Sequence, residues 1–380
     1  MSADNSHYAM KAESTFSLKD ELFNAEKVDA LAISISRVYP DFETSRFCKT
    51  VVKAFPDLEL KERIVHITAC LEDHLPKTFP KAVGILLKAL PPELDPSKTD
   101  DDFGDFILAP VSHYVVRNGC SEKHLSRSLN ALREITKRFS AEDAIRYFIN
   151  AFPEESFAFL DECSRDGNYH VRRLASEGSR PRLPWSQKLV TGFEKPLPIL
   201  EELHKDPTRY VTRSVANHLN DISKLDSATV ITLLKRWKKQ KRQSENELAF
   251  ITRHSLRTLV KESNRDALKL LGFDPSPDLT IESLSAVVEE IAIGESFEFL
   301  LRLVANKAQK LLIDYVMEGP SGRAKVYKIK QLSVGKGEVV ELQKRHPMRL
   351  MTSRTLETGT HKITLQINGK RFDAIEFVLS

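Results

Sequence analysis

The segment at 166–185, DGNYHVRRLASEGSRPRLPW, combines four arginines with a single acid beyond its opening residue. The arginines are Arg172, Arg173, Arg180 and Arg182, and the acid is Glu177. Guanidinium groups suit phosphates, whereas a carboxylate among them can stabilise positive charge that develops on a reacting group. Glu177 precedes Gly178, a residue typical of helix ends, where the helix dipole disfavours an acid by up to ~1 kcal/mol. The segment predicts either a reactive carboxylate in a cationic groove or a local salt bridge from Glu177 to Arg173 or Arg180.

A second acid, Glu142, lies within RFSAEDAIRYF. The spacing of Ser140 and Asp143 resembles a capping box, which predicts that Ser140 caps a helix covering Ala141–Phe152. Glu142 would then lie in the first turn, where the helix dipole favours a negative charge. From the residues alone, a structural role for Glu142 is the favoured interpretation.

Trp185 ends a proline-flanked loop beside the arginines, and His170 opens the same segment. An aromatic ring held in a rigid loop can stack on a base or pack on a sugar. We therefore assign Trp185 and His170 to a possible ligand-binding group. Packing in the core is the alternative for Trp185, and packing between helices is the alternative for His170.

Composition excludes several other classes of protein. The chain has 380 residues, of which 41% are hydrophobic and 29% charged, as in a soluble globular protein. It contains no apolar run of the length of a membrane span and no apolar core of a signal peptide near its start, so we expect a cytoplasmic protein. The four cysteines form no CxxC pair and the eleven histidines no HExxH motif, so we expect no metal and no cofactor.

The periodicity of apolar residues changes along the chain. Up to about Gly272, apolar residues recur every three or four positions, which indicates helices; clear examples are Glu62–Asp73, Ser126–Phe139, Ala141–Phe152 and Thr229–Gln240. After Pro275, polar and apolar residues alternate, and Asn368-Gly369 separates two such runs, which indicates a β-hairpin. The expected fold is an α + β two-domain protein, with a helical domain at 1–272 and a β-sandwich at 278–380.

The helical half repeats with a period of 40 residues. Val171, Val211 and Ile251 share one register position. A second register position carries an arginine in every repeat, namely Arg133, Arg173, Arg213 and Arg253. This period is typical of HEAT-like helix pairs that stack into a solenoid. The arginines would recur on one face, either as braces between repeats or as a groove for a ligand. In the register of Glu177 the next repeats carry Asn217 and Arg257, so the repeat itself does not require an acid there.

A second group of basic residues lies at 235–242 and surrounds Trp237. Such a run suits a polyanion such as a nucleic acid. The alternative is a solvated helix face on which Trp237 alone points into the core.

Several segments together resemble the AlkC family of bacterial alkylpurine DNA glycosylases. They are HVRRLASEGSRPRLPW, KRFSAEDAIR, RSVANHLNDISK, RHSLRTLVK with ALKLLGF, and the N-terminal LELKERIVHITACLEDHLPKTFPKAVGIL. The resemblance covers nearly the whole chain. It implies an all-α HEAT-like repeat solenoid followed by a C-terminal immunoglobulin-like β-sandwich, in agreement with the two periodicities.

The resemblance also implies a reaction. It is hydrolysis of the N-glycosidic bond of a cationic alkylated base, such as 3-methyladenine, in double-stranded DNA, without flipping the base into a protein pocket. Glu142 and Glu177 then look like the acids that face the damaged nucleotide, and Arg173 and Trp185 like their neighbours. One departure concerns Arg138, because the similar AlkD glycosylases carry a tryptophan one turn before their catalytic acid.

The remaining basic residues are assigned to the DNA backbone. They are Arg172, Arg180, Arg182, Arg213 and Arg253 in the helical half, and Lys325 and Lys328 in the sandwich. A sandwich that does not touch DNA is the alternative for the two lysines. We expect a monomer that binds no membrane. The other functions considered are a catalytically silent protein that binds damaged DNA and a protein–protein scaffold, the latter being a common use of HEAT solenoids.

Overall fold

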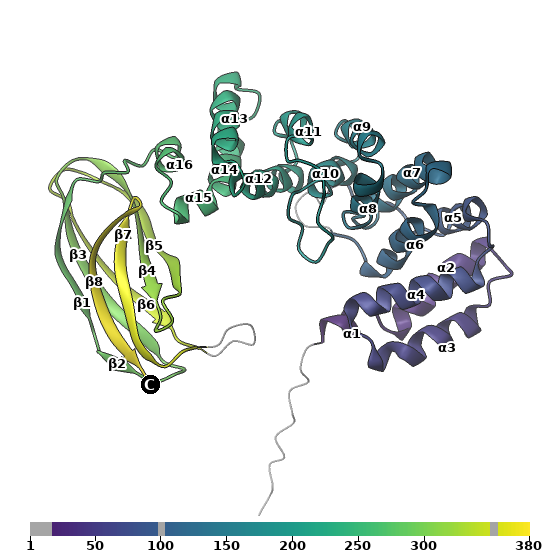
Figure 1. Ribbon diagram of the computed structural model, residues 1–380, viewed down its shortest axis with the longest axis horizontal. Coiled ribbons are helices and arrows are strands. Elements are labelled where there is room, and N and C mark those ends of the chain that lie inside the picture. The colour runs from purple at the N-terminus through teal and green to yellow at the C-terminus, as the bar shows by residue number, and fades with distance from the viewer. Residues whose placement is uncertain (1–16, 98–102, 350–355) are drawn as a thin grey trace, which may run out of the picture. The chain divides into compact units, whose positions relative to one another are not determined.

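A computed structural model describes residues 17–97, 103–349 and 356–380 (Figure 1). By its internal contacts the chain divides into two compact units, Met1–Val215 and Ala216–Ser380. The division falls inside a helix, α12, which spans Arg209–Ser223. None of the helices in the described ranges is long and apolar enough to cross a membrane.

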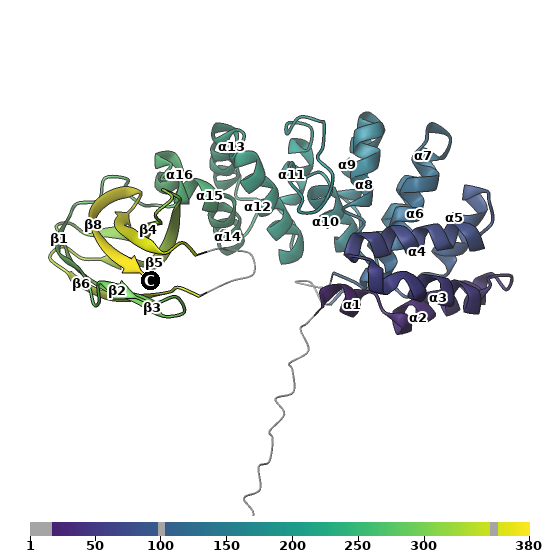
Figure 2. The same ribbon diagram turned by 60° about the horizontal axis from the view of Figure 1, so that its bottom comes forward.

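The described part of the first unit is helical. Its helices before α12 are α1 (Leu18–Leu22), α2 (Ala25–Val38), α3 (Thr44–Ala54), α4 (Leu60–His74), α5 (Phe79–Lys88), α6 (Ala109–Gly119), α7 (Leu125–Thr136), α8 (Ala144–Ala151), α9 (Pro153–Cys163), α10 (Tyr169–Glu177) and α11 (Leu197–Leu203). Consecutive helices pack against each other, α2 on α3, α6 on α7, α8 on α9 and α10 on α11 (Figure 2). The helical periodicity read from the sequence is thus confirmed for this half.

The start of α8 differs from the prediction. Ser140 does not cap this helix, which begins at Ala144 after Asp143. The hydroxyl of Ser140 instead donates a hydrogen bond of 2.8 Å to Glu142. The predicted capping box is therefore wrong, because a contact with the neighbouring acid takes the hydroxyl that would have capped the helix. Glu142 consequently lies in the connection before α8 and not in its first turn.

α10 carries the arginine-rich motif and ends at Glu177, before the glycine, as predicted. The side chain of Asn168 caps its start by accepting a hydrogen bond from the backbone N–H of His170. Gly178 does not have the left-handed conformation of a C′ glycine, since its φ is −64°. A Cβ atom at this position would lie 2.4 Å from Cγ2 of Ile145 in α8. The glycine is needed because α8 packs against the end of α10, and not because of its backbone angle.

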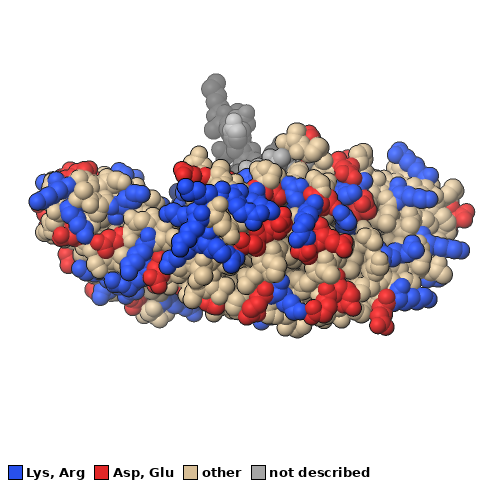
Figure 3. Space-filling model, turned by 90° about the horizontal axis from the view of Figure 1, so that it is seen from above, with Lys and Arg blue, Asp and Glu red and all other residues tan. Residues whose placement is uncertain are grey.

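The second unit contains the end of α12 and four further helices. They are α13 (Ser227–Gln240), α14 (Glu245–Ser255), α15 (Arg257–Lys261) and α16 (Arg265–Leu270). Trp237 is fully buried in the core, whereas the six basic side chains around it at 235–242 are exposed. Figure 3 shows lysine and arginine side chains gathered where α13 lies. The segment 235–242 thus has an exposed basic surface and one buried aromatic side chain.

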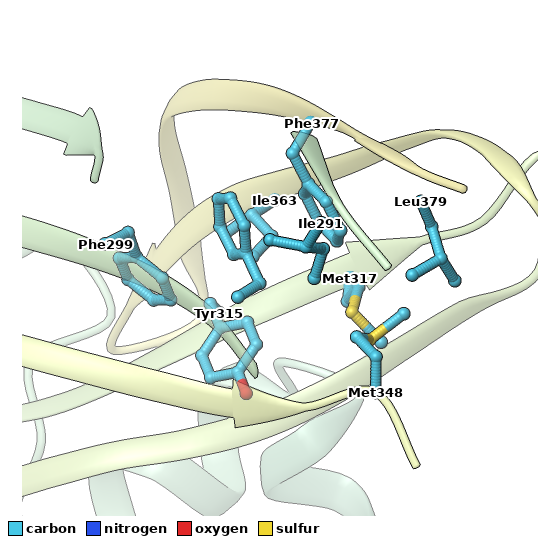
Figure 4. Packing of buried hydrophobic residues seen from close by; sticks show 9 residues of the cluster. Ile291, Phe299, Tyr315, Met317, Met348, Ile363, Phe377 and Leu379 are labelled. Atoms are coloured by element: carbon cyan, nitrogen blue, oxygen red, sulfur yellow. The ribbon is translucent and has the colours of Figure 1, made fainter. Parts of the chain in front are cut away.

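The strands of the second unit form two sheets. They are β1 (Leu279–Ala286), β2 (Glu290–Ile291), β3 (Ser296–Ala305), β4 (Gln309–Glu318), β5 (Ala324–Val334), β6 (Val339–Pro347), β7 (Gly359–Ile367) and β8 (Lys370–Leu379). Their orders are β1-β3-β6 and β2-β8-β7-β4-β5. Phe299, Tyr315, Ile363 and Phe377 come from both sheets and meet in the core between them (Figure 4). The predicted C-terminal β-sandwich is confirmed.

The predicted hairpin between β7 and β8 is present. Asn368 and Gly369 have φ values of +48° and +81°, the left-handed angles that a type I′ turn requires. The side-chain amide of Asn368 also donates a hydrogen bond of 2.9 Å to the carbonyl of Asp274. This bond ties the hairpin to the segment that joins α16 to the first strand.

Candidate active site around Arg173

Arg173 is the centre of a cluster of charged side chains in the first unit. Its guanidinium is buried and donates a hydrogen bond of 2.7 Å to Glu142 Oε2, and its other terminal nitrogen lies 3.7 Å from Glu177 Oε2. The same guanidinium lies over the ring of Tyr210, 4.4 Å from its centroid. Burial works against the charge of Arg173, but Glu142 and Glu177 outweigh this effect and raise its pKa. Arg173 is thus a fixed cation between two acids.

Glu177 is the more buried of the two acids. Its carboxylate accepts a hydrogen bond of 2.5 Å from Ser214, and Arg180 pairs with its other oxygen. Burial alone would raise the pKa of Glu177, but Arg173, Arg180 and Ser214 together lower it below its ordinary value. Glu177 is therefore ionised at neutral pH. The local salt bridge considered from the sequence is present, and it involves both arginines.

Glu142 is the more open acid. Its side chain is 17% exposed, compared with 6% for Glu177. One of its oxygens receives the hydrogen bonds of Arg173 and Ser140. Because part of the carboxylate remains accessible, Glu142 is the acid that a ligand at the surface of the first unit can contact directly.

Tyr210, whose ring faces Arg173, was not predicted from the sequence. Burial raises the pKa of Tyr210 to about 12, so its hydroxyl remains protonated. That hydroxyl is buried and has no hydrogen-bond partner among the described residues. A signal was available, because Tyr210 follows His170 by one repeat of 40 residues. His170 itself is buried and packs its ring against those of Tyr169 and Tyr210, with centroid distances of 4.1 and 5.8 Å.

Trp185 lies in a strained loop close to Glu142. Its side chain is 69% exposed, and its φ is +66°, an angle that bulky residues rarely adopt. Such a conformation costs about 1–3 kcal/mol and persists only where the surroundings enforce it. Lys61 donates a hydrogen bond to the carbonyl of Trp185, and the buried Arg146 holds the loop through the carbonyls of Gly178, Arg180 and Gln187 at 3.0, 2.7 and 2.7 Å. The loop thus presents an aromatic ring to solvent at a fixed place.

The recurring arginines do not share one role. Arg133 pairs with Asp166, and the equivalent acid one repeat later, Asp206, pairs with Arg172 at 2.5 Å. Arg172 therefore has the bracing role in its repeat. This shift by one position leaves Arg173 available for the acid cluster.

The remaining residues predicted from the sequence lie outside the acid–arginine cluster. Arg213 is partly buried with its guanidinium 5.8 Å from the ring centroid of Tyr210, and Arg182 is exposed. Arg253, Lys325 and Lys328 are exposed and belong to the second unit. Arg138 donates hydrogen bonds of 3.0 Å to the carbonyls of Pro91 and Glu134 and so fixes the end of α7. The structure thus brings together Glu142, Arg173, Glu177 and Arg180.

A cavity of about 280 Å³ borders the cluster on the side of Glu142. Residues from α4, α6 and α8 and from the Trp185 loop line it, and Phe103, Phe106, Phe139, Tyr147 and Trp185 are its aromatic members. Phe103 also lies beneath Arg173, with its centroid 5.7 Å from the guanidinium carbon. No group of three or more histidine, cysteine or acidic side chains in the described part of the chain could hold a metal ion.

These features define a two-domain protein, in which a helical region carries a buried acid–arginine cluster and an immunoglobulin-like domain follows. Residues 280–380 match the family model "Uncharacterised protein YhaZ, C-terminal Ig-like domain". The chain is 34% identical over 365 residues to the uncharacterized protein YhaZ of Bacillus subtilis (strain 168), covering 94% of this chain and 98% of that protein. It is also similar to the alkylpurine DNA glycosylase AlkC of Pseudomonas fluorescens bound to DNA containing an abasic site analog, with 32% identity and a TM-score of 0.85. That match covers 96% of this chain and 99% of the other. The chain belongs to the AlkC family.

Proposed function

We propose that this protein is a monofunctional DNA glycosylase. It hydrolyses the N-glycosidic bond of cationic alkylated bases, such as 3-methyladenine, in duplex DNA. The observation that supports the proposal is the cluster of Glu142, Glu177 and Arg173, in a chain similar over nearly its whole length to a glycosylase bound to abasic DNA.

The chemistry of the substrate explains why carboxylates would suffice. An alkylated purine already carries a positive charge, so it leaves without a general acid. The sugar becomes oxocarbenium-like, and a nearby anion stabilises this charge. Two observations support this role for Glu142: its carboxylate is partly exposed, and Arg173 and Ser140 fix it. The same carboxylate can orient the attacking water.

Glu177 is the second acid of the proposal. In the free protein it is almost fully buried, and it holds Arg173 and Arg180 in position. It acts on the sugar through the field of the cluster, or directly if the cluster rearranges when DNA binds. Catalytic contacts often tighten only in the complex with substrate.

The rest of the binding surface would hold the DNA. Trp185 packs on a base or sugar next to the lesion, and Arg182 and Arg213 contact phosphates of the same segment. Arg253, Lys325 and Lys328 contribute from the second unit. We also propose that the two domains span residues 1–272 and 278–380. The helices of the first domain would stack as HEAT-like repeats.

The experiment that tests the proposal is a single-turnover excision assay. The protein in excess over methylated duplex DNA should release 3-methyladenine, and no release would contradict the proposal. Glu142→Gln and Glu177→Gln should each slow release by roughly an order of magnitude or more, through loss of a charge worth about 1.4 kcal/mol or more in the transition state. Glu134→Gln is the matched control, because Glu134 also pairs with an arginine, Arg138, but lies outside the cluster.

One observation favours a second candidate, a protein that binds damaged DNA without excising the base. Both acids are already neutralised by arginines in the free protein. If these pairs persist on DNA, no net negative charge faces the sugar. DNA binding without release of any alkylated base would identify this function.

A further inference from the structure

The cavity beside Glu142 has the features of a small-molecule site. Its volume of about 280 Å³ is close to the lower end of the range for ligand pockets, roughly 300–1,000 Å³. Phe103 and Phe106 are stacked with a centroid distance of 5.6 Å, and Phe139 packs edge-on against both at 5.5 and 5.0 Å. Tyr147 and Trp185 add two further rings. Aromatic walls of this kind suit the faces of a planar ring.

Two polar atoms in the lining lack partners. Ser112, on α6, is 4% exposed, and its hydroxyl makes no hydrogen bond with any described residue. The side-chain nitrogen of Gln187 is also buried and without a partner. A buried polar atom without a hydrogen bond costs about 1–3 kcal/mol. Polar edges on a ligand in this cavity would remove that cost.

The nature of the ligand follows from these groups. A purine base has two flat faces for the rings, and an edge of ring nitrogens and an amino group for Ser112 and Gln187. The ligand should also carry no net charge, because Arg173 balances Glu142 and the two other charged side chains of the lining, Lys61 and Asp143, have opposite signs. When the glycosidic bond of a cationic alkylated purine breaks, the bonding electron pair stays with the base and cancels its positive charge. The released base therefore has the required neutrality.

We propose that this cavity binds the free purine base after it has been released. The proposal rests on the proposed glycosylase function for the origin of the base, but not for the binding itself. Glu142 borders both the acid cluster and the cavity, so the base would have only a short path to move. Occupancy would keep the base away from the abasic sugar.

Isothermal titration calorimetry of the full chain with free 3-methyladenine and with adenine, in the absence of DNA, tests the binding. We expect a dissociation constant between about 10 µM and 1 mM, as for other fragment-sized ligands. Ser112→Ala and Gln187→Leu should each weaken binding about 3- to 10-fold, since each removes one hydrogen bond. Ser156→Ala is the matched control, because Ser156 is a buried serine with an unpaired hydroxyl outside the cavity, and it should leave binding unchanged.

The titration is then repeated with a duplex that contains an abasic-site analogue. Binding of the base should persist within about threefold, because the base and the abasic DNA occupy different places. No binding at millimolar base, equal effects of Ser112→Ala and Ser156→Ala, or displacement of the base by the duplex would each overturn the proposal. Excision without binding of the free base overturns only this inference, whereas binding without excision overturns only the glycosylase function.

Discussion

Arg173 is held in place by the protein before any substrate arrives. Two carboxylates, one serine hydroxyl and two aromatic rings surround its guanidinium. Together with Arg180, the cluster contains two positive and two negative charges. A balanced group of this kind can stay buried, whereas an unpaired member could not. The geometry of the site is therefore a property of the free protein.

Replacement of Glu177 by glutamine should test this balance. The variant leaves two arginines with one carboxylate in a buried place, so we expect the free energy of unfolding to fall by about 3 kcal/mol. Urea unfolding at neutral pH measures the change. Glu134→Gln, which removes a more exposed acid, should change stability by less than about 1 kcal/mol. Equal stabilities of the two variants would show that the Glu177 pair contributes little to folding.

Asp314 in β4 should make stability depend on pH. Burial raises its pKa from an ordinary 3.8 to about 6, although Lys328 and Lys261 partly oppose the change. The folded protein thus keeps a proton that the unfolded chain has lost, and stability should fall as pH rises from about 4 to about 6. Asp314→Asn should raise the free energy of unfolding at pH 8 by up to about 3 kcal/mol and have little effect at pH 4. Asp373→Asn, an exposed control, should behave like the parent at both values.

At the scale of elements, the contact between α8 and the end of α10 fixes the position of the site. Gly178→Ala places a methyl group against Ile145 and should destabilise the protein by about 1–3 kcal/mol. Gly84→Ala is the contrasting control, because the position lies in α5 and has open space for a side chain. That change should stabilise the protein by up to about 1 kcal/mol. Thermal unfolding of both variants compares the two effects.

The sequence allowed the elements to be predicted better than their contacts. The period of three to four residues located the helices, and Asn368-Gly369 located the hairpin, because these signals are local. The predicted start of α8 was wrong because the Ser140 hydroxyl donates its hydrogen bond to Glu142, outside the helix. The repeat predicted that Arg173 lies on a recurring face. It did not predict that Arg172 takes the bracing role, because this depends on how two helices pack. The family resemblance alone implied that Arg173 is a neighbour of Glu142, and the ion pair between them was not predicted.

At the scale of the whole molecule, the distribution of basic residues predicts strong salt dependence of DNA binding. Each phosphate contact contributes about 0.9 to the slope of log affinity against log salt concentration. The double variant Lys325→Ala/Lys328→Ala should weaken binding at low salt and reduce this slope by about 2. Fluorescence anisotropy with labelled duplex DNA at several salt concentrations measures both the affinity and the slope. Lys336→Ala/Lys362→Ala, in the same domain, is the control, and equal slopes for the two double variants would support a sandwich that does not bind DNA.

The closed arrangement of charges around Arg173 also restricts how the sequence can diverge. Because every member of the cluster neutralises another, a single replacement at 142, 173, 177 or 180 leaves an uncompensated charge, whereas a paired replacement does not. The exposed Arg182, only two residues beyond Arg180, has no such constraint. Among related sequences, these four positions should therefore change in acid–arginine pairs or not at all, and 182 should vary independently of them.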